Sequence, residues 1–136
     1  MTGYSGTPLP KKLGLKAPLM LVAIDAPQEY LAWLGELPAG IQIAPKSSNP
    51  IQAAHVFVTE RAILEKHLVT FRRQLEQNGF VWVSWPKKGS KVETDITENT
   101  IREIALPLGF VDIKVCAVSD VWSGLKLVIR KNERTT

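Results

Sequence analysis

Phe80-Val81-Trp82-Val83-Ser84-Trp85 is apolar at nearly every position and rich in aromatic side chains. A run of this kind is typical of a strand that is buried on both faces, as the strands of a parallel sheet are. We therefore predict that residues 80–85 form the central or near-central strand of a parallel sheet. The rest of the chain must supply the neighbouring strands and the helices that cover them.

Upstream of this stretch, strand patterns alternate with helix patterns. Residues 19–24 form a continuous apolar run, residues 41–44 a weaker one and residues 54–58 a clearer one. A short helix pattern around Tyr30 follows the first run. This alternation is typical of strands joined by crossover helices in a parallel sheet.

Two further helices are predicted on either side of the central strand. Thr59 is the expected N-cap of the longer helix, and Asn78-Gly79 has the chemistry of its C-terminal end. Asp95 and Glu98 resemble a capping pair at the start of the second helix, which ends before Gly109. Both helices are amphipathic, so each is expected to pack one face on the sheet.

Two more strand patterns follow, over residues 111–118 and 125–130. The segment between them is too short for a parallel crossover, so the two strands are expected to form an antiparallel hairpin. The fold class predicted from the whole pattern is α/β. More closely, we expect a Rossmann-like three-layer domain with a mostly parallel sheet and an antiparallel C-terminal hairpin.

The sequence is divided into an arm, one domain and a tail. Glycine, proline and lysine interrupt any regular pattern over residues 1–16, which we interpret as a flexible basic arm. Residues 17–131 form a single domain, and residues 132–136 are expected to be a disordered tail.

Composition favours a cytoplasmic protein. No apolar run is long enough to span a bilayer, and the first residues lack the apolar stretch of a secretory signal. Cys116 is the only cysteine and lies in a predicted strand, which suits a buried thiol in a reducing compartment. The net charge of +4 is modest and does not by itself specify a nucleic-acid binder.

Three motifs carry a resemblance to a known family. They are Gly3-Tyr4-Ser5-Gly6-Thr7-Pro8-Leu9, Trp85-Pro86-Lys87-Lys88 and Val121-Trp122-Ser123-Gly124-Leu125-Lys126. Together they resemble an uncharacterised bacterial family of small domains of unknown function. The resemblance covers nearly the whole chain and implies a bacterial, cytoplasmic origin but no activity.

The order of elements is also similar to that of class I methyltransferases, which use S-adenosylmethionine and end in an antiparallel hairpin. The resemblance implies a methyltransferase-like topology. The chain departs from that family after the first strand, where Asp25-Ala26-Pro27 stands in place of a glycine-rich turn. Residues 41–45 also lack the acid that would bind the ribose hydroxyls. We therefore predict no cofactor, with S-adenosylmethionine as the disfavoured exception.

The best candidate site lies where the central strand ends. Ligands of open parallel sheets gather at the carboxyl ends of the strands, and here those ends carry lysines beside an aromatic side chain. Such a loop could hold a phosphate or carboxylate, although a solvated loop over a packed tryptophan is the simpler reading. The candidate ligand-binding residues are Trp85, Lys87, Lys88, Lys91, Trp122, Lys126 and Asp25.

Other chemistry is less well supported. His55 and His67 are the only histidines, and no cysteine or acid stands at metal-ligand spacing from them, so neither a metal site nor a Ser-His-Asp arrangement is predicted. Trp122 could be an exposed stacking surface or could cover the sheet end near Trp85. A nucleic-acid surface is a further hypothesis, built from the basic N-terminal arm with Tyr4, together with Lys87, Lys88, Lys91, Arg130, Lys131 and Arg134.

The sequence thus predicts a domain without catalysis more readily than an enzyme. Our leading hypothesis is a cofactor-less domain that binds a small anionic ligand or a protein partner at the carboxyl-end edge of the sheet. A divergent S-adenosylmethionine-dependent methyltransferase is the first alternative, and a nucleic-acid accessory protein is the second. A homodimer through the hairpin edge and Trp122 is possible, and no membrane partner is expected.

Overall fold

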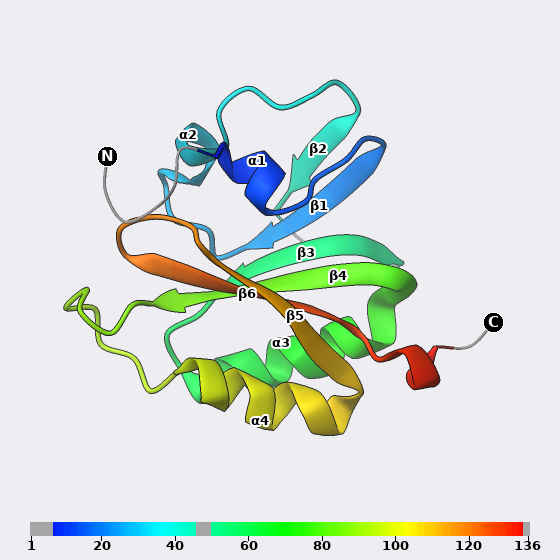
Figure 1. Cartoon of the computed structure of the whole chain (residues 1–136), viewed down its shortest axis with the longest axis vertical. Coiled ribbons are helices and arrows are strands. Elements are labelled where there is room, and N and C mark those ends of the chain that lie inside the picture. Colours follow the sequence, from blue (N-terminus) through cyan, green and yellow to red (C-terminus); the bar gives the residue numbers. More distant parts are fainter. Residues whose placement is uncertain (1–6, 46–49, 135–136) are drawn as a thin grey trace.

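A computed structural model describes residues 7–45 and 50–134 of the chain (Figure 1). It has one six-stranded sheet with the order β2-β1-β3-β4-β6-β5. The strands are β1 (Leu19–Ile24), β2 (Ile41–Ala44), β3 (Ile51–Phe57), β4 (Leu75–Pro86), β5 (Phe110–Ala117) and β6 (Trp122–Ile129). The helices are α1 (Leu9–Lys12), α2 (Tyr30–Leu34), α3 (Arg61–Gln74), α4 (Glu98–Leu108) and a short 3₁₀ turn, η1 (Lys131–Glu133).

The predicted fold class is confirmed. β1 pairs in parallel with β2 and β3, and β3 pairs in parallel with β4. β6 runs antiparallel to both β4 and β5. In the C-terminal hairpin, β6 therefore lies between β4 and β5, and β5 forms the edge of the sheet. Helices α1 and α2 lie on one side of the sheet and α3 and α4 on the other, which makes three layers (Figure 1).

The central strand separates two apolar cores because successive side chains of a strand point to opposite faces. Val81, Val83 and Trp85 belong to the core beneath α3 and α4. Trp82 belongs to the core beneath α1 and α2, where it is completely buried. The apolar run therefore marks a strand covered on both faces, as predicted from its composition.

The predicted boundary between the long helix and the central strand is wrong. The helix ends at Gln74, and Leu75 is already extended and paired with Ile51 of β3. The register then shifts before Phe80 pairs with Ala53, so Asn78-Gly79 belongs to an irregularity in β4 and not to a helix end. A Cβ on Gly79 would lie 2.7 Å from the carbonyl oxygen of Gln52, which explains why glycine stands there.

The predicted flexible arm is also wrong for residues 7–16. These residues contain α1, and Leu9, Leu13 and Leu15 are buried in the core beneath α1 and α2. The indole Nε1 of Trp82 donates a hydrogen bond of 2.9 Å to the carbonyl oxygen of Leu13, which fixes the segment to the sheet. Residues 1–6, the rest of the predicted arm, lie outside the described residues.

Three smaller expectations also need correction. Residues 132–133 of the predicted disordered tail belong to η1, and the carboxylate of Glu133 pairs with the guanidinium of Arg72 at 3.7 Å. Residues 135–136 lie outside the described residues. Cys116 on β5 is half-buried and not fully buried. Trp122 begins β6 opposite Pro86 and so belongs to a strand, not to the hairpin turn.

Within residues 7–45 and 50–134, none of the helices combines the length and the apolar character that a membrane span requires.

Candidate functional site

A cleft of about 1090 Å³ lies at the carboxyl ends of β3 and β4. Trp85 and Pro86 at the end of β4 line it, and Thr59 lines it from the end of β3. The segment between β4 and α4 forms much of the remaining wall. The lining residues are Thr59, Glu60, Trp85–Lys88, Val92–Glu98 and Ser123.

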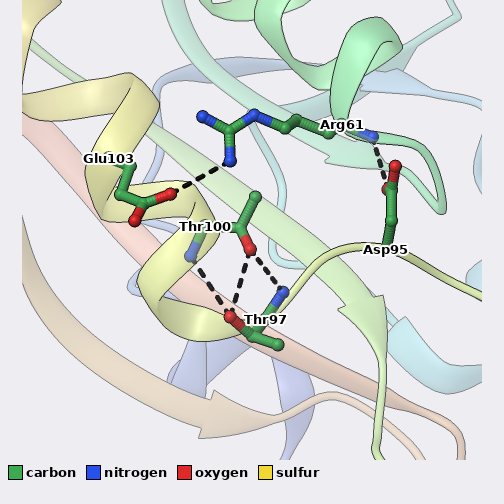
Figure 2. Close-up of polar contacts among 5 residues, drawn as sticks. All are labelled: Arg61, Asp95, Thr97, Thr100 and Glu103. Atoms are coloured by element: carbon green, nitrogen blue, oxygen red, sulfur yellow. Dashed lines mark hydrogen bonds and ion pairs between the residues drawn. The ribbon is translucent and has the colours of Figure 1, made fainter.

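The segment between β4 and α4 is tied to the end of β3. The Oγ1 hydroxyl of Thr94 donates a hydrogen bond of 2.7 Å to the carbonyl oxygen of Thr59, and the backbone N–H of Asp95 donates to the same oxygen at 3.3 Å. The Oδ1 atom of Asp95 accepts a bond of 2.7 Å from the backbone N–H of Arg61 (Figure 2). These contacts hold one wall of the cleft in place.

Both long helices begin at the cleft. The first backbone N–H of α3 is capped by Asp95, and Thr97 caps α4 by accepting from the N–H of Thr100 at 3.2 Å (Figure 2). The Arg61 guanidinium also reaches Glu103 of α4 at 3.0 Å and joins the two helices (Figure 2). The positive ends of two helix dipoles therefore face the same hollow.

This capping pattern differs from the predicted one. Thr59 is not the N-cap of α3, because Glu60 occupies that position and makes no side-chain cap. The Asp95–Glu98 pair is not the capping box of α4 either, because Thr97 and Thr100 form it. Asp95 instead caps the other helix, across the chain.

The charges around the cleft are mixed. Lys87 and Lys88 come directly after β4, and Lys88 is exposed. Among the lining acids, Asp95 is engaged by the N-terminus of α3, and Glu98 pairs with Arg102. Two of the four lining carboxylates thus already have internal partners, which leaves Glu60 and Glu93 beside Lys87 and Lys88.

Only some of the predicted site residues meet in this cleft. Trp85, Lys87 and Lys88 line it, whereas Lys91 is exposed on the neighbouring loop with a left-handed φ of 69° and does not. Trp85 pairs with Ser123 and Trp122 pairs with Pro86, so the two tryptophans point to opposite faces of the sheet. The expectation that Trp122 covers the sheet end beside Trp85 is therefore wrong.

Lys126 and Asp25 lie elsewhere. Lys126 is opposite Trp82 in the middle of β6, and its ammonium lies 4.4 Å from the centre of the Phe80 ring. Burial, together with the nearby charge of Lys114, lowers the pKa of Lys126. Asp25 is exposed directly after β1 and adopts a left-handed φ of 57°.

A buried network of three hydrogen-bonded side chains was not predicted from the sequence. The Nδ1 atom of His55 is 2.7 Å from the Tyr30 hydroxyl, and its Nε2 atom is 2.7 Å from the Ser84 hydroxyl. All three side chains are almost fully buried, and the imidazole stacks on Phe57 at 4.3 Å between ring centres. Burial lowers the pKa of His55 to about 3 and raises that of Tyr30. The three side chains are inaccessible to solvent, and their hydrogen bonds to one another satisfy polar groups that would otherwise be buried unpaired.

His55 and Ser84 occupy adjacent strands, and the only sequence signal for their pairing is a polar residue in each of two buried runs. The position of Tyr30 depends on how α2 folds over the sheet. His67 does not join this network but stacks on Phe71 in α3. Among the described residues, no group of three His, Cys, Asp or Glu side chains is arranged to hold a metal ion.

The proposed nucleic-acid surface is not assembled as one patch. Three of the lysines, Lys87, Lys88 and Lys91, follow the end of β4, which pairs with the start of β6. Arg130 follows the other end of β6, and at about 3.3 Å per residue the length of that strand separates it from the lysines by roughly 25 Å. Arg130 and Arg134 both donate to backbone carbonyl oxygens, of Leu106 and Ile129 respectively. Tyr4 lies outside the described residues.

Solved structures with a similar fold include methyltransferases. An S-adenosylmethionine-dependent methyltransferase from Aquifex aeolicus has a TM-score of 0.59 at 13% identity, over 88% of this chain and 86% of that one. The pyocyanin biosynthetic protein PhzM has a TM-score of 0.63 at 10% identity, over 89% of this chain and 53% of that one. A fibrillarin pre-rRNA processing protein from Methanococcus jannaschii has a TM-score of 0.54 at 11% identity, over 94% and 71%.

At these identities the similarity establishes the fold alone, which is methyltransferase-like. The chain spans only about half of PhzM and 47% of LepI, another protein of similar fold. No curated protein matches the chain significantly in sequence.

A family model matches residues 57–131, which run from the end of β3 to η1 and include the whole lining of the cleft. The model is described as a protein of unknown function, DUF3052. Since the match covers more than half of the chain, the chain belongs to the DUF3052 family.

Proposed function

We propose that this protein is a binding domain that holds a small anionic ligand in the cleft at the carboxyl ends of β3 and β4. The observation that carries the proposal is the meeting of Lys87 and Lys88 with the starts of α3 and α4 around one hollow. Helix dipoles at helix starts favour phosphate and carboxylate groups. Because Asp95 and Thr97 already accept from N–H groups of the two helices, Lys87 and Lys88 would make the direct contacts to the ligand. A cleft of about 1090 Å³ is large enough for a small molecule.

The apolar part of the lining suits the remainder of such a ligand. Trp85, Pro86 and Ile96 provide an apolar floor, and Val92 is 42% exposed at the rim. The cleft is open and not filled by side chains. An open cleft favours a small ligand, whereas a filled surface would favour a protein partner. The ligand we expect has an anionic group for the lysines and an apolar or ring portion for the floor.

Isothermal titration against inorganic phosphate, nucleotides and phosphorylated sugars tests the proposal. We expect saturable heat with at least one probe and a loss of affinity of at least tenfold in the double variant Lys87→Ala/Lys88→Ala, because charged hydrogen bonds are strong. Lys66→Ala, an exposed lysine of α3 that does not line the cleft, is the matched control. Absence of heat with every probe, or equal binding by the double variant, would reject the anion site.

A divergent methyltransferase is the second candidate, favoured by the fold that the chain shares with the enzyme from Aquifex aeolicus. The turn after β1 does not fit the usual cofactor contact, because Asp25-Ala26-Pro27 replaces the glycines that let a backbone approach the cofactor. A thermal-shift assay with millimolar S-adenosylmethionine and its demethylated product separates the two candidates. Stabilisation by either compound supports the enzyme, and an unchanged melting temperature counts against it.

A further inference from the structure

A second hollow, of about 340 Å³, lies between the start of α2 and the turn that joins β5 to β6. The described residues that line it are Glu29, Trp33 and Val118–Trp122. They include two tryptophans and two carboxylates, but no lysine or arginine. It thus differs from the cleft beside Lys87 and Lys88, whose lining includes basic side chains.

The turn that forms one wall is held in a single shape. The Ser119 hydroxyl accepts from the backbone N–H groups of both Val121 and Trp122 at 3.1 Å. The carbonyl oxygen of Trp122 accepts from the N–H groups of Val118 and Ser119, at 2.9 and 3.2 Å. Ser119 itself is buried, so the hydrogen bonds that hold the turn are shielded from solvent.

The Trp122 ring is positioned by the core beneath it. It contacts the Phe57 ring edge-on, with 5.2 Å between ring centres, and Phe57 in turn stacks on His55. Trp33 lies on α2, where its backbone N–H donates to the carbonyl oxygen of Glu29 at 3.0 Å. Both indoles are half-buried, so each keeps part of its surface available to the hollow.

Two indoles beside the Glu29 carboxylate form an environment that favours positive charge. The face of a tryptophan attracts cations more strongly than that of any other side chain. A methylated ammonium is weakly hydrated and offers apolar methyl groups, so it loses little on contact with indoles, and the exposed carboxylate of Glu29 adds long-range attraction. We propose that this hollow binds a small organic cation carrying a methylated ammonium group.

Choline and its neutral carbon isostere, 3,3-dimethylbutan-1-ol, test the proposal because they share shape and differ in charge. Titrations of the full chain followed by tryptophan fluorescence should show choline binding at least tenfold more tightly than the alcohol. A peptide bearing trimethyllysine is titrated in parallel. Tighter binding of either cation supports the site and identifies the source of the ammonium group.

Two variants locate the binding. Trp122→Phe keeps an aromatic ring against Phe57 but weakens the cation contact, and Glu29→Gln removes one carboxylate at constant size. Each should lower affinity roughly threefold to tenfold. Glu36→Gln, an exposed acid outside this hollow, is the control and should bind as the wild type does.

Circular dichroism confirms that each variant is folded before it is titrated. Equal binding of choline and the alcohol, no binding of any cation, or wild-type affinity in both Trp122→Phe and Glu29→Gln would overturn the proposal. None of these results bears on the anion cleft, which has its own lysine variants.

Discussion

His55 is completely buried between the hydroxyls of Tyr30 and Ser84, and this placement makes the stability of the fold depend on pH. Burial lowers the pKa of His55 from 6.5 to about 3, so the folded protein keeps a neutral imidazole. Below pH 6.5 the unfolded chain binds a proton at this position and the folded chain does not. Stability therefore falls as the pH falls from 6.5 towards 3.

The size of this effect follows from the pH interval. Between pH 7.5 and pH 5, His55 should remove about 2 kcal/mol from the free energy of unfolding, at about 1.4 kcal/mol per pH unit below 6.5. Urea unfolding at the two pH values measures the loss. His55→Gln, which keeps a donor and an acceptor but does not titrate, should lose about 2 kcal/mol less over the same interval.

His67 provides the matched control. Burial lowers its pKa and the nearby charge of Asp25 opposes that shift, while the side chain is only half-buried. His67→Gln should therefore change the pH dependence less than His55→Gln does. Parallel pH profiles for the wild type and His55→Gln would show that His55 does not control the acid sensitivity.

At the scale of elements, α3 depends on a residue from outside the helix. Its N-cap, Glu60, makes no side-chain cap, and Asp95 accepts from the N–H of Arg61 at 2.7 Å instead. Asp95→Ala should lower the free energy of unfolding by about 1 kcal/mol, the typical effect of losing a cap. Chemical denaturation measures it, with Glu93→Ala, an exposed acid two residues away, as the control. A loss as large in Glu93→Ala would mean that general charge, not capping, is responsible.

The same cap shows where prediction from sequence stops. The strands around residues 19–24 and 80–85 could be predicted because an apolar run bounded by turn residues is a local signal. The contact from Asp95 to Arg61 joins residues far apart in sequence, and no local pattern reveals it. The end of α3 was misplaced for a related reason, since Leu75 is extended through its pairing with Ile51.

The residues of the candidate site also divide into those with a local sequence signal and those whose position depends on how distant strands pair. Trp85, Lys87 and Lys88 could be predicted because they follow a recognisable central strand, and ligands gather at the ends of such strands. Trp122 and Lys126 were grouped with them wrongly, because which face each one occupies depends on the register between β4 and β6. A shift of one residue in that register would exchange the two faces.

At the scale of the whole molecule, the first turns of the described chain complete the third layer. Without α1 and the residues that follow it, Trp82 would lose the carbonyl partner that Leu13 supplies, and the core beneath α1 and α2 would lose part of its cover. The Nζ atom of Lys12 also donates to the carbonyl oxygen of Ala117 at 3.0 Å, which links this segment to the edge strand β5. The segment is therefore part of the folded unit.

Leu13→Ala tests that conclusion quantitatively. Leu13 is 0% exposed, so its truncation should lower the free energy of unfolding by about 2–5 kcal/mol, the range for large-to-small changes in a core. Leu31→Ala is the matched control because Leu31 is 63% exposed, and its effect should stay within about 0.5 kcal/mol. If both variants unfold at the same denaturant concentration as the wild type, the segment around α1 contributes nothing to the core. A selective loss in Leu13→Ala, with one cooperative transition, shows that all three layers unfold together.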